Sequence, residues 1–390
     1  MKRTRLILRI CSCVCLAIVA MVVAVAVSYS EPKHRHTLTD AKTYFVYDDH
    51  IEYTRGCTDG CTVKFDTGAK FNDLFLMTTE QDKIVLEDDI VLNSEIYLKS
   101  YITLEDTLEF NINLDLNNHT ISTDIADSEN DSMFMFNANR GNVNLNVSNG
   151  KLLSETTSYI FRFKNTKRSG QNIKINLDNV ECEVSGIEAT PLFAHDCVNI
   201  EFNANNSKFI SNTVSSNNGD YGVGAFINSD SEFNFDNCYF EGGDAVYVKD
   251  GVVNLKGCKL VNSGLAHHSA QGVETLFSAV GACLTVDSHS DGSSYTKFIV
   301  TIDGCEMESQ SSVKMIYALQ TANDAGVEVG LDPNSIVNVL SCKFNNDPNY
   351  EGVPSFEDSK DIIKYPNNEA PQNYGTETWI CGNWSESINN

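Results

Sequence analysis

Acidic residues are missing from the first thirty positions, where the chain has no Asp or Glu but four basic residues, the last of them Arg9. Residues 10–27 follow as an almost wholly apolar run, about as long as a bilayer-spanning helix. Because a basic flank stays cytoplasmic, we expect a signal-anchor that places the rest of the chain outside the cytoplasm, as a single-pass protein at the cell surface. The small residues Ser28 and Ser30 leave the alternative of a cleaved signal peptide and a secreted protein.

Long apolar runs are absent from the remainder of the sequence, which excludes a second membrane-spanning segment there. Positive charge is also scarce, with 28 Lys and Arg against 53 Asp and Glu and a formal net charge of −25. Such a surface repels phosphate backbones and anionic lipid headgroups, so we expect no nucleic-acid partner and membrane contact only through the N-terminal helix. Apolar residues make up 42 %, which is enough for a core and excludes a largely disordered chain.

Cysteine is frequent, but the spacings that hold metal ions are missing. Three of the 13 cysteines lie in the N-terminal apolar segment, which leaves ten in the rest of the chain. Cys57 and Cys61, in the polar sequence RGCTDGC, are the candidate disulfide pair. A zinc site there is the alternative, but it needs two further ligands, and no second CxxC or HxxxH lies nearby. We therefore expect no metal site.

The middle of the chain repeats the pattern apolar-x-apolar-x-anchor-x-x-apolar. Leu145, Val147, Asn149 and Leu152 form one copy, in which Asn149 is the anchor. Successive anchors are between 20 and 47 residues apart, so the local pattern is regular although its spacing is not. The anchors are Asn118, Asn149, Asn179, Asn206, Asn237, Gly257, Gly304 and Ser341.

Each copy predicts two strands joined by a turn at the anchor. The alternation of apolar and other residues before the anchor indicates a strand with one buried face, and the apolar positions after the anchor indicate a second strand. Asn and Gly enter the left-handed backbone region at the lowest cost, which suits a turn residue, whereas Ser341 departs from this rule. A third apolar segment precedes most copies, for example at residues 133–136 and 159–161. Three short strands per repeat predict a parallel β-solenoid of at least eight coils.

An antiparallel sandwich or barrel is the alternative fold. It predicts short hairpin loops, for which the dipeptides at 149–150 and 218–219, both Asn-Gly, are candidates. The repeated anchor continues instead into a second inward-facing strand, which favours the solenoid. On that fold one inward column is expected to contain Leu116, Val147, Leu177, Phe235 and Leu255.

Four copies have a cysteine directly after the anchor, which predicts an inward-facing column of buried thiols. Side chains stacked on parallel strands point the same way and suit disulfide geometry poorly, so we favour free thiols over a disulfide series or a soft-metal column. The Asn anchors are likewise expected to stack as a hydrogen-bonded amide ladder at the turn. The four cysteines are Cys238, Cys258, Cys305 and Cys342.

Two stretches of the chain resemble the opening of pectate-lyase-like proteins, especially exported bacterial surface members. They are KIVLEDDIVL at 83–92 and INLDLNNHTI at 112–121, where Asn118 replaces the glycine of the family phrase. The resemblance covers about residues 82–345 and implies a right-handed parallel β-helix. Before it, FNDLFLM at 71–77 resembles the short amphipathic helix that caps such stacks. The fold does not fix the activity.

The phrases that carry catalysis in that superfamily are missing. A lyase needs a base and a cation site for a uronate carboxylate, and neither Trp-Ile-Asp-His nor Arg-x-Pro-x-x-Arg occurs. The hydrolases use clustered aspartates, and the nearest match, at 241–248, contains only Asp244; its structural alternative is a glycine turn before a strand. The acidic runs at 87–89 and 124–131 are candidates for loosely bound Ca²⁺ but lack the spacing of a dedicated site. No other cofactor is expected.

Proline is rare, and four of the seven prolines lie beyond residue 347, where the apolar periodicity fades. We therefore expect a signal-anchor or signal peptide at 1–30, a linker and cap at 31–80, the β-helix at 81–346 and an irregular C-terminal cap at 347–390. The missing catalytic phrases favour a non-enzymatic, adhesin-like or glycan-contacting protein, with an extracellular glycan or a host or cell-surface ligand as partner. The alternatives are a polysaccharide lyase or glycoside hydrolase with divergent catalytic residues, and a structural envelope component.

Overall fold

The computed structural model describes residues 37–97, 109–125, 132–137, 142–164, 172–185, 189–212, 222–263, 281–288, 297–309, 315–320, 332, 334–345, 362–365, 371–374 and 378–382. These residues form β-strands and one short helix. The chain divides into two compact units, of which the first comprises residues 1–40 and 55–63 and the second comprises residues 41–54 and 64–390.

In the first unit, two chain segments are joined by hydrogen bonds. The Arg55 Nε atom donates to the Thr39 carbonyl oxygen at 2.7 Å, and the Thr39 hydroxyl donates to the Gly56 carbonyl oxygen at 3.2 Å. Thr39 belongs to β1 (Leu38–Val46), and Arg55 and Gly56 belong to β2 (Ile51–Cys57). Both strands continue into the second unit, as does the next strand, β3 (Thr62–Thr67).

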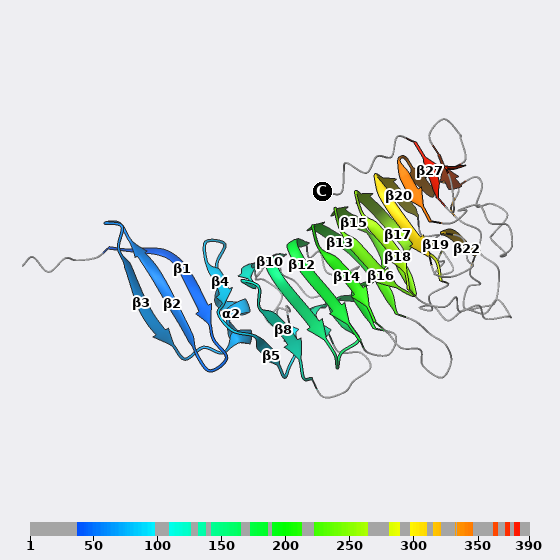
Figure 1. Ribbon diagram of the computed structural model, residues 1–390. Helices are drawn as coiled ribbons and strands as arrows, with labels where there is room; N and C mark the ends of the chain where they lie inside the picture. The colour runs from blue at the N-terminus through cyan, green and yellow to red at the C-terminus, as the bar shows by residue number, and fades with distance from the viewer. Residues whose placement is uncertain are drawn as a thin grey trace, which may run out of the picture. The chain divides into compact units, whose positions relative to one another are not determined.

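The second unit contains a stack of short parallel strands, through which the chain passes in three ladders, A, B and C (Figure 1). Ladder A contains residues 43–46 of β1, β4 (Lys83–Leu86), β7 (Glu109–Asp115), β10 (Asn142–Ser154), β12 (Ile173–Val184), β13 (Thr190–Asn205), β15 (Val223–Asp236), β17 (Asp244–Lys256), β20 (Phe298–Asp303), β23 (Ile336–Val339) and β25 (Ile363–Lys364). Ladder B contains β5 (Ile90–Leu92), β8 (Thr120–Thr123), the second halves of β10 and β12, β14 (Lys208–Ser211), β16 (Tyr239–Gly242), β18 (Lys259–Asn262), β21 (Cys305–Ser309) and β24 (Cys342–Phe344). Ladder C contains β6 (Ile96–Tyr97), β9 (Ser132–Asn137), β11 (Tyr159–Lys164), the first halves of β13, β15 and β17, β19 (Leu284–Ser288) and β22 (Ile316–Gln320).

This topology confirms the predicted all-β fold with a long, mostly parallel sheet, and it is consistent with a β-solenoid. Ladder C has eight strands within the described residues, which agrees with the expectation of at least eight coils. The antiparallel alternative does not describe these ladders, because each anchor leads the chain from ladder A into ladder B rather than back along the same strand.

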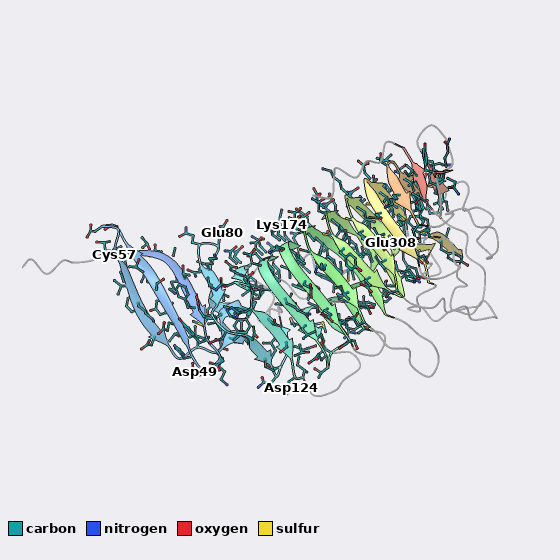
Figure 2. All side chains as sticks on the ribbon, viewed as in Figure 1. Asp49, Cys57, Glu80, Asp124, Lys174 and Glu308 are labelled. Carbon is teal, nitrogen blue, oxygen red and sulfur yellow. A yellow bond between two sulfur atoms is a disulfide. The ribbon has the colours of Figure 1, made fainter. Side chains whose placement is uncertain are left out.

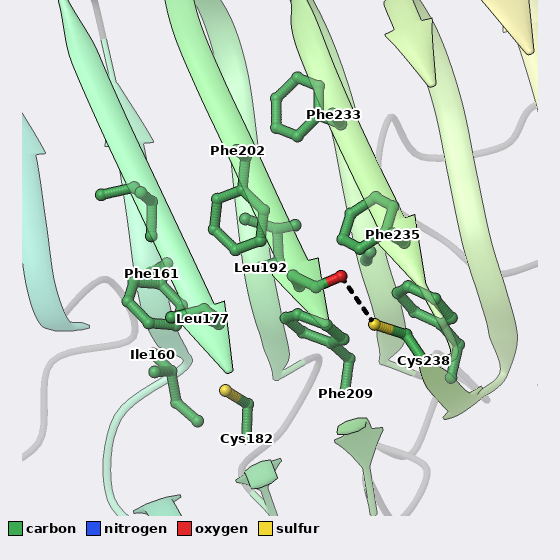
Figure 3. Packing of buried hydrophobic residues seen from close by; sticks show 14 of the residues in the cluster. Ile160, Phe161, Leu177, Cys182, Leu192, Phe202, Phe209, Phe233, Phe235 and Cys238 are labelled. Carbon is green, nitrogen blue, oxygen red and sulfur yellow. Dashed lines mark hydrogen bonds between the residues drawn. The ribbon is translucent and has the colours of Figure 1, made fainter. Parts of the chain in front are cut away.

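Inward-facing side chains of successive coils stack in buried columns. Phe209 and Phe240 of ladder B stack with ring centroids 5.1 Å apart, and Phe134 and Phe161 of ladder C stack at 5.4 Å. Figure 3 shows Phe161 and Phe209 together with aliphatic side chains such as Leu177 in the interior between the ladders. One ladder A column contains Leu114, Val147, Leu177, Ala204, Phe235, Leu255 and Ile302.

The predicted place of Leu116 in this column is wrong, because Leu114 pairs with Val147 instead. Four residues lie between Asp115 and Thr120 in the first turn, whereas two lie between the equivalent Ser148 and Lys151. The longer turn has two successive left-handed residues, at 117 and 118, with φ of 50° and 67°. It moves Leu116 out of the column, although its side chain is fully buried.

The helix expected at 71–77 is present as α2 (Phe71–Met77). The Asp73 carboxylate accepts a hydrogen bond from the Lys70 backbone N–H at 3.0 Å, which stabilises the first turn. Leu74 and Phe75 are buried in the core of the stack, and the Phe75 ring lies edge-on to Phe134 at 5.9 Å. The helix therefore packs on the first coils, as Figure 1 shows beside β4.

Residues 1–30, the expected signal-anchor or signal peptide, lie outside the described residues. Among the residues that the structure does describe, no helix is long and apolar enough to span a membrane.

Strands also occur in segments that were expected to be a linker or irregular. Residues 43–46 of β1 pair in parallel with β4, so ladder A begins before residue 81. At the other end β25 extends ladder A beyond residue 346, and β27 (Trp379–Cys381) pairs antiparallel with both β24 and β26 (Gln372–Asn373). These strands pair with backbone groups that the end coils would otherwise expose.

Candidate functional site

The seven Asn and Gly anchors all adopt the left-handed backbone conformation between ladders A and B. Their φ angles run from 48° at Asn206 to 67° at Asn118 and include Asn149, Asn179, Asn237, Gly257 and Gly304. The described residues with positive φ do not include Ser341. Among the anchor amides the structure records one mutual hydrogen bond, from Asn179 Nδ2 to Asn149 Oδ1 at 3.5 Å. The anchors therefore serve mainly the backbone of the turn.

The cysteines that follow the anchors lie inside the stack, where Cys238, Cys258, Cys305 and Cys342 are all buried with free thiols. The Cys238 thiol donates to the Ala204 carbonyl oxygen at 3.3 Å, as Figure 3 shows. The Cys258 backbone N–H donates to Cys305 Sγ at 3.3 Å. Burial raises the pKa of the Cys258 thiol well above its usual value, which disfavours the nucleophilic thiolate at that position.

Asp244, the catalytic candidate, is fully buried at the start of β17. Its Oδ1 atom accepts hydrogen bonds from the backbone N–H groups of Gly281 and Ala282, at 2.8 and 2.7 Å. A carboxylate in this position fixes the backbone of a neighbouring segment and presents no surface to a polysaccharide. The arrangement favours the structural interpretation of Asp244.

Cys57 and Cys61 form a disulfide with their Cα atoms 5.1 Å apart. Within the described part of the chain, no group of three or more His, Cys, Asp and Glu side chains is arranged to hold a metal ion. Of the acidic runs considered for Ca²⁺, Asp89 accepts a hydrogen bond from the Thr120 backbone N–H at 2.8 Å, and residues 126–131 lie outside the described residues. Calcium binding stays a prediction.

A hydrogen-bonded amide ladder does exist, but on the outer face of ladder A. We call it the outer amide ladder; it consists of Asn113, Asn146, Asn176, Asn203, Asn234 and Asn254. Each Nδ2 donates to the Oδ1 of the preceding coil, at 2.8, 2.7, 3.0, 3.0 and 2.8 Å from Asn146 to Asn254. All six side chains are partly exposed.

The sequence contained a signal for this ladder that the repeat pattern left unused. In six of the eight copies, five of them consecutive, the unassigned position between the two apolar residues before the anchor is asparagine, as in Leu145-Asn146-Val147. Alternation places this position outside, and an identical outward residue in consecutive coils stacks on itself.

Three hollows lie over the outer face of ladder A. Their volumes are about 590, 350 and 370 Å³, and the second and third are lined by members of the outer amide ladder. The first lies along the adjacent outward column, where Asn144, Lys174 and Glu201 belong to successive coils. Lys174 is labelled at the edge of the stack in Figure 2. The Oδ1 atom of Asn144 is buried there and accepts no hydrogen bond from any described residue.

The lysines that line these hollows are all paired with carboxylates of neighbouring coils. Lys83 lies 2.9 Å from Asp115, Lys174 lies 2.6 Å from Glu201, and Lys256 lies 3.9 Å from Asp236. The hydrogen bond from Lys174 lowers the pKa of Glu201, which favours its charged carboxylate. The face is therefore rich in hydrogen-bonding groups while its cations are already neutralised.

The outer face of ladder B has a different character. Lys151 lies 3.0 Å from Glu181 and also pairs with Glu183, and Lys208 lies 2.9 Å from Glu181. The same pairing of a lysine with a glutamate of the neighbouring coil recurs further along, where Lys259 lies 2.8 Å from Glu308 and Lys343 lies 2.8 Å from Glu306. These pairs link consecutive coils and satisfy one another. The outer amide ladder and the three hollows make ladder A the candidate binding face.

Comparisons with protein-family models, with curated proteins and with solved structures each found no match.

Proposed function

We propose that this protein is a non-enzymatic, adhesin-like surface solenoid that binds an extended neutral glycan along the outer face of ladder A. The observation that carries the proposal is the outer amide ladder. It extends over six coils, or about 24 Å at roughly 4.8 Å per coil, which is the scale of a linear oligosaccharide rather than a small metabolite.

The chemistry of the ladder suits sugar hydroxyls. An Asn amide has two donor hydrogens and an oxygen with two lone pairs. In the ladder, the bond to the preceding coil uses one hydrogen, and the bond from the following coil uses one lone pair. Asn203 and Asn234 direct their Nδ2 groups also to Glu201 and Glu232, at 2.9 and 3.0 Å. The described bonds leave one amide hydrogen each on Asn146, Asn176 and Asn254, together with the second lone pair of the ladder oxygens, and a sugar hydroxyl can serve as either partner. A rotation of Asn144 would also present its unsatisfied oxygen to a ligand.

Charge supports a neutral ligand over an acidic one. A uronan would need free cations on the face, but the lysines that line the hollows already pair with carboxylates. The buried position of Asp244 likewise gives no support to a hydrolase. The proposal therefore ranks binding above the lyase and hydrolase alternatives, and keeps the purely structural envelope component as the alternative in which no glycan binds.

The proposal includes the fold family and the location. The resemblance of residues 83–92 and 112–121 to pectate-lyase-like proteins supports a right-handed parallel β-helix. The basic and apolar N-terminal residues support a cell-surface location, either anchored or secreted.

Binding of neutral and acidic polysaccharides of matched length to the full-length protein tests this proposal. We expect at least one neutral glycan to bind. Replacing both Asn146 and Asn176 by Ala should weaken it by about tenfold or more, because two or three lost neutral hydrogen bonds cost roughly 1–3 kcal/mol. The matched control is Asn212→Ala, since Asn212 is exposed at the end of β14 and bonds to Glu183 on ladder B. Absorbance from unsaturated uronate products would contradict the proposal, and absence of any glycan binding would favour the structural component.

A further inference from the structure

The two described elements at the end of the stack bring two free cysteines directly opposite each other. β24 (Cys342–Phe344) and β27 (Trp379–Cys381) are antiparallel, and Cys342 is the register partner of Cys381. Both side chains are buried in the same core cluster. Because directly opposed residues of an antiparallel pair place their side chains on the same face, the two thiols face each other.

The separation expected for this antiparallel pair falls within the range that a disulfide requires. Opposed residues of an antiparallel pair have Cα atoms about 4.5–5.5 Å apart, and disulfides span Cα separations of about 4.4–6.8 Å. Cys342 is also a parallel neighbour of Cys305 on its other side. Side chains of parallel neighbours stack in one direction and suit a disulfide poorly, so the same thiol has one suitable partner and one unsuitable partner.

We infer that Cys342 and Cys381 form a second disulfide that fastens the C-terminal strand β27 to the last coil of the stack. The inference does not depend on the proposed ligand. The disulfide between Cys57 and Cys61 supports it, because disulfides form and persist in oxidising surroundings, where two opposed thiols are also oxidised.

The reaction is a thiol–disulfide exchange with an external disulfide, either a small molecule or an oxidoreductase. Cys381 loses a proton, and its sulfur attacks one sulfur of the external disulfide and releases the first thiolate. Cys342 then loses a proton and attacks the Cys381 sulfur of the mixed disulfide, which releases the second thiolate. The two protein thiols lose two electrons in total, and the external disulfide is reduced to two thiols.

The environment favours Cys381 as the first nucleophile. The hydrogen bond between the two thiols lowers the pKa of Cys381, whereas burial raises the pKa of Cys342. The chain is also tightly held after Cys381. Gly382 has a φ of 64°, and a Cβ atom added there would lie 2.0 Å from the Leu340 carbonyl oxygen. β27 is therefore seated closely on the last coil before any bond forms.

The bond would matter because β27 covers the end of ladder B. Without it, β27 is held by short antiparallel pairings with β24 and β26 at the open end of a stack, where local unfolding is easiest. A bond from 342 to 381 closes a loop of about 40 residues and ties that end to the core.

Peptide mapping of the full-length protein tests the inference. The purified, reduced protein is incubated with oxidised glutathione, unfolded in the presence of a thiol-alkylating reagent without reductant, and digested for mass spectrometry. We expect a peptide pair linking Cys342 to Cys381 alongside the Cys57–Cys61 bond, and full alkylation of Cys238, Cys258 and Cys305. Alkylation of Cys342 and Cys381, or a link from Cys342 to Cys305, would overturn it.

Limited proteolysis gives a second measurement on the wild-type protein. We expect oxidation to slow release of the C-terminal residues by about tenfold or more, because cleavage requires local opening. Cys381→Ala should remove this protection, whereas Cys305→Ala, a buried thiol of the preceding coil, should keep it. Equal cleavage rates for the oxidised and reduced wild-type protein would contradict a fastening role.

Discussion

At the scale of single residues, asparagine serves different purposes in the turns and on the outer face of the strands. Asn206 and Asn237 occupy left-handed turn positions, where the backbone conformation is what the residue supplies. Asn203 and Asn234, three positions earlier, join the outer amide ladder through their side chains. Asp244 illustrates a third case, since its buried carboxylate is an acceptor for backbone N–H groups.

The burial of Asp244 leads to a prediction about stability. Asp244→Ala removes the acceptor of two buried backbone N–H groups and should lower the free energy of unfolding by about 2–4 kcal/mol. Asp178→Ala is the matched control, because Asp178 is exposed on ladder A, and it should change stability by no more than about 0.5 kcal/mol. Urea unfolding followed by circular dichroism measures both. A fully stable Asp244→Ala protein that had lost an enzymatic activity would instead support the catalytic interpretation.

At the scale of elements, the helix and the end strands determine where the stack stops. A parallel stack exposes unpaired strand edges and apolar side chains at both ends. α2 contributes Leu74 and Phe75 to the core at one end, while its Leu76 side chain is 62 % exposed. At the other end, β27 reverses direction and pairs antiparallel with β24. The two ends are therefore closed by different elements, for the same physical reason.

The contrast between neighbouring helix residues gives a prediction about the cap. Phe75→Ala should destabilise the protein by about 3 kcal/mol or more, because it leaves a cavity beside Phe71 and Phe134. Leu76→Ser should leave the denaturation midpoint almost unchanged, because that side chain is exposed. Chemical denaturation of the two variants tests this. Similar midpoints for both would show that α2 does not contribute to the core.

At the scale of the whole molecule, a strongly acidic chain is stabilised by pairing part of its excess charge across coils. Lys151 and Lys208 both contact Glu181, so the three residues link consecutive coils of ladder B. Hydrogen bonds from Lys208 and Lys151 lower the pKa of Glu181 below its usual 4.5. The net charge of −25 makes such pairs more valuable, because each lysine also reduces the repulsion among the remaining carboxylates.

This network predicts a pH dependence. A carboxyl group whose pKa is lower in the folded state contributes stability above its unfolded pKa, and that contribution is lost as the pH falls through the folded pKa. Glu181→Gln should therefore be less stable than the wild-type protein at pH 7, by about 1 kcal/mol or less, and the difference should vanish towards pH 3. Thermal unfolding measured across this range tests it, with Glu155→Gln as an exposed control. A difference that persists at pH 3 would point to packing rather than charge.

Local physical rules make much of the fold predictable from the sequence. Alternation of period two marks a strand wherever it occurs, and Asn and Gly favour left-handed turns irrespective of their surroundings, so the positions of strands and turns follow from the residues alone. The expectation of α2 at residues 71–77 came instead from the resemblance of that segment to the helices that cap such stacks. The buried cysteines after the anchors followed from the strand phase.

The tertiary structure decided what depends on register and on distant segments. The outer amide ladder exists because coils stack in phase, which repeat spacings of 20 to 47 residues do not determine. Asp244 was placed in the interior by backbone N–H groups about forty residues away, at Gly281 and Ala282. The pairing of Cys342 with Cys381 required the chain to reverse direction at the end of the stack. Sequence thus determined the local conformation of this protein, whereas contacts between distant coils determined which side chains meet, because only the folded chain sets those distances.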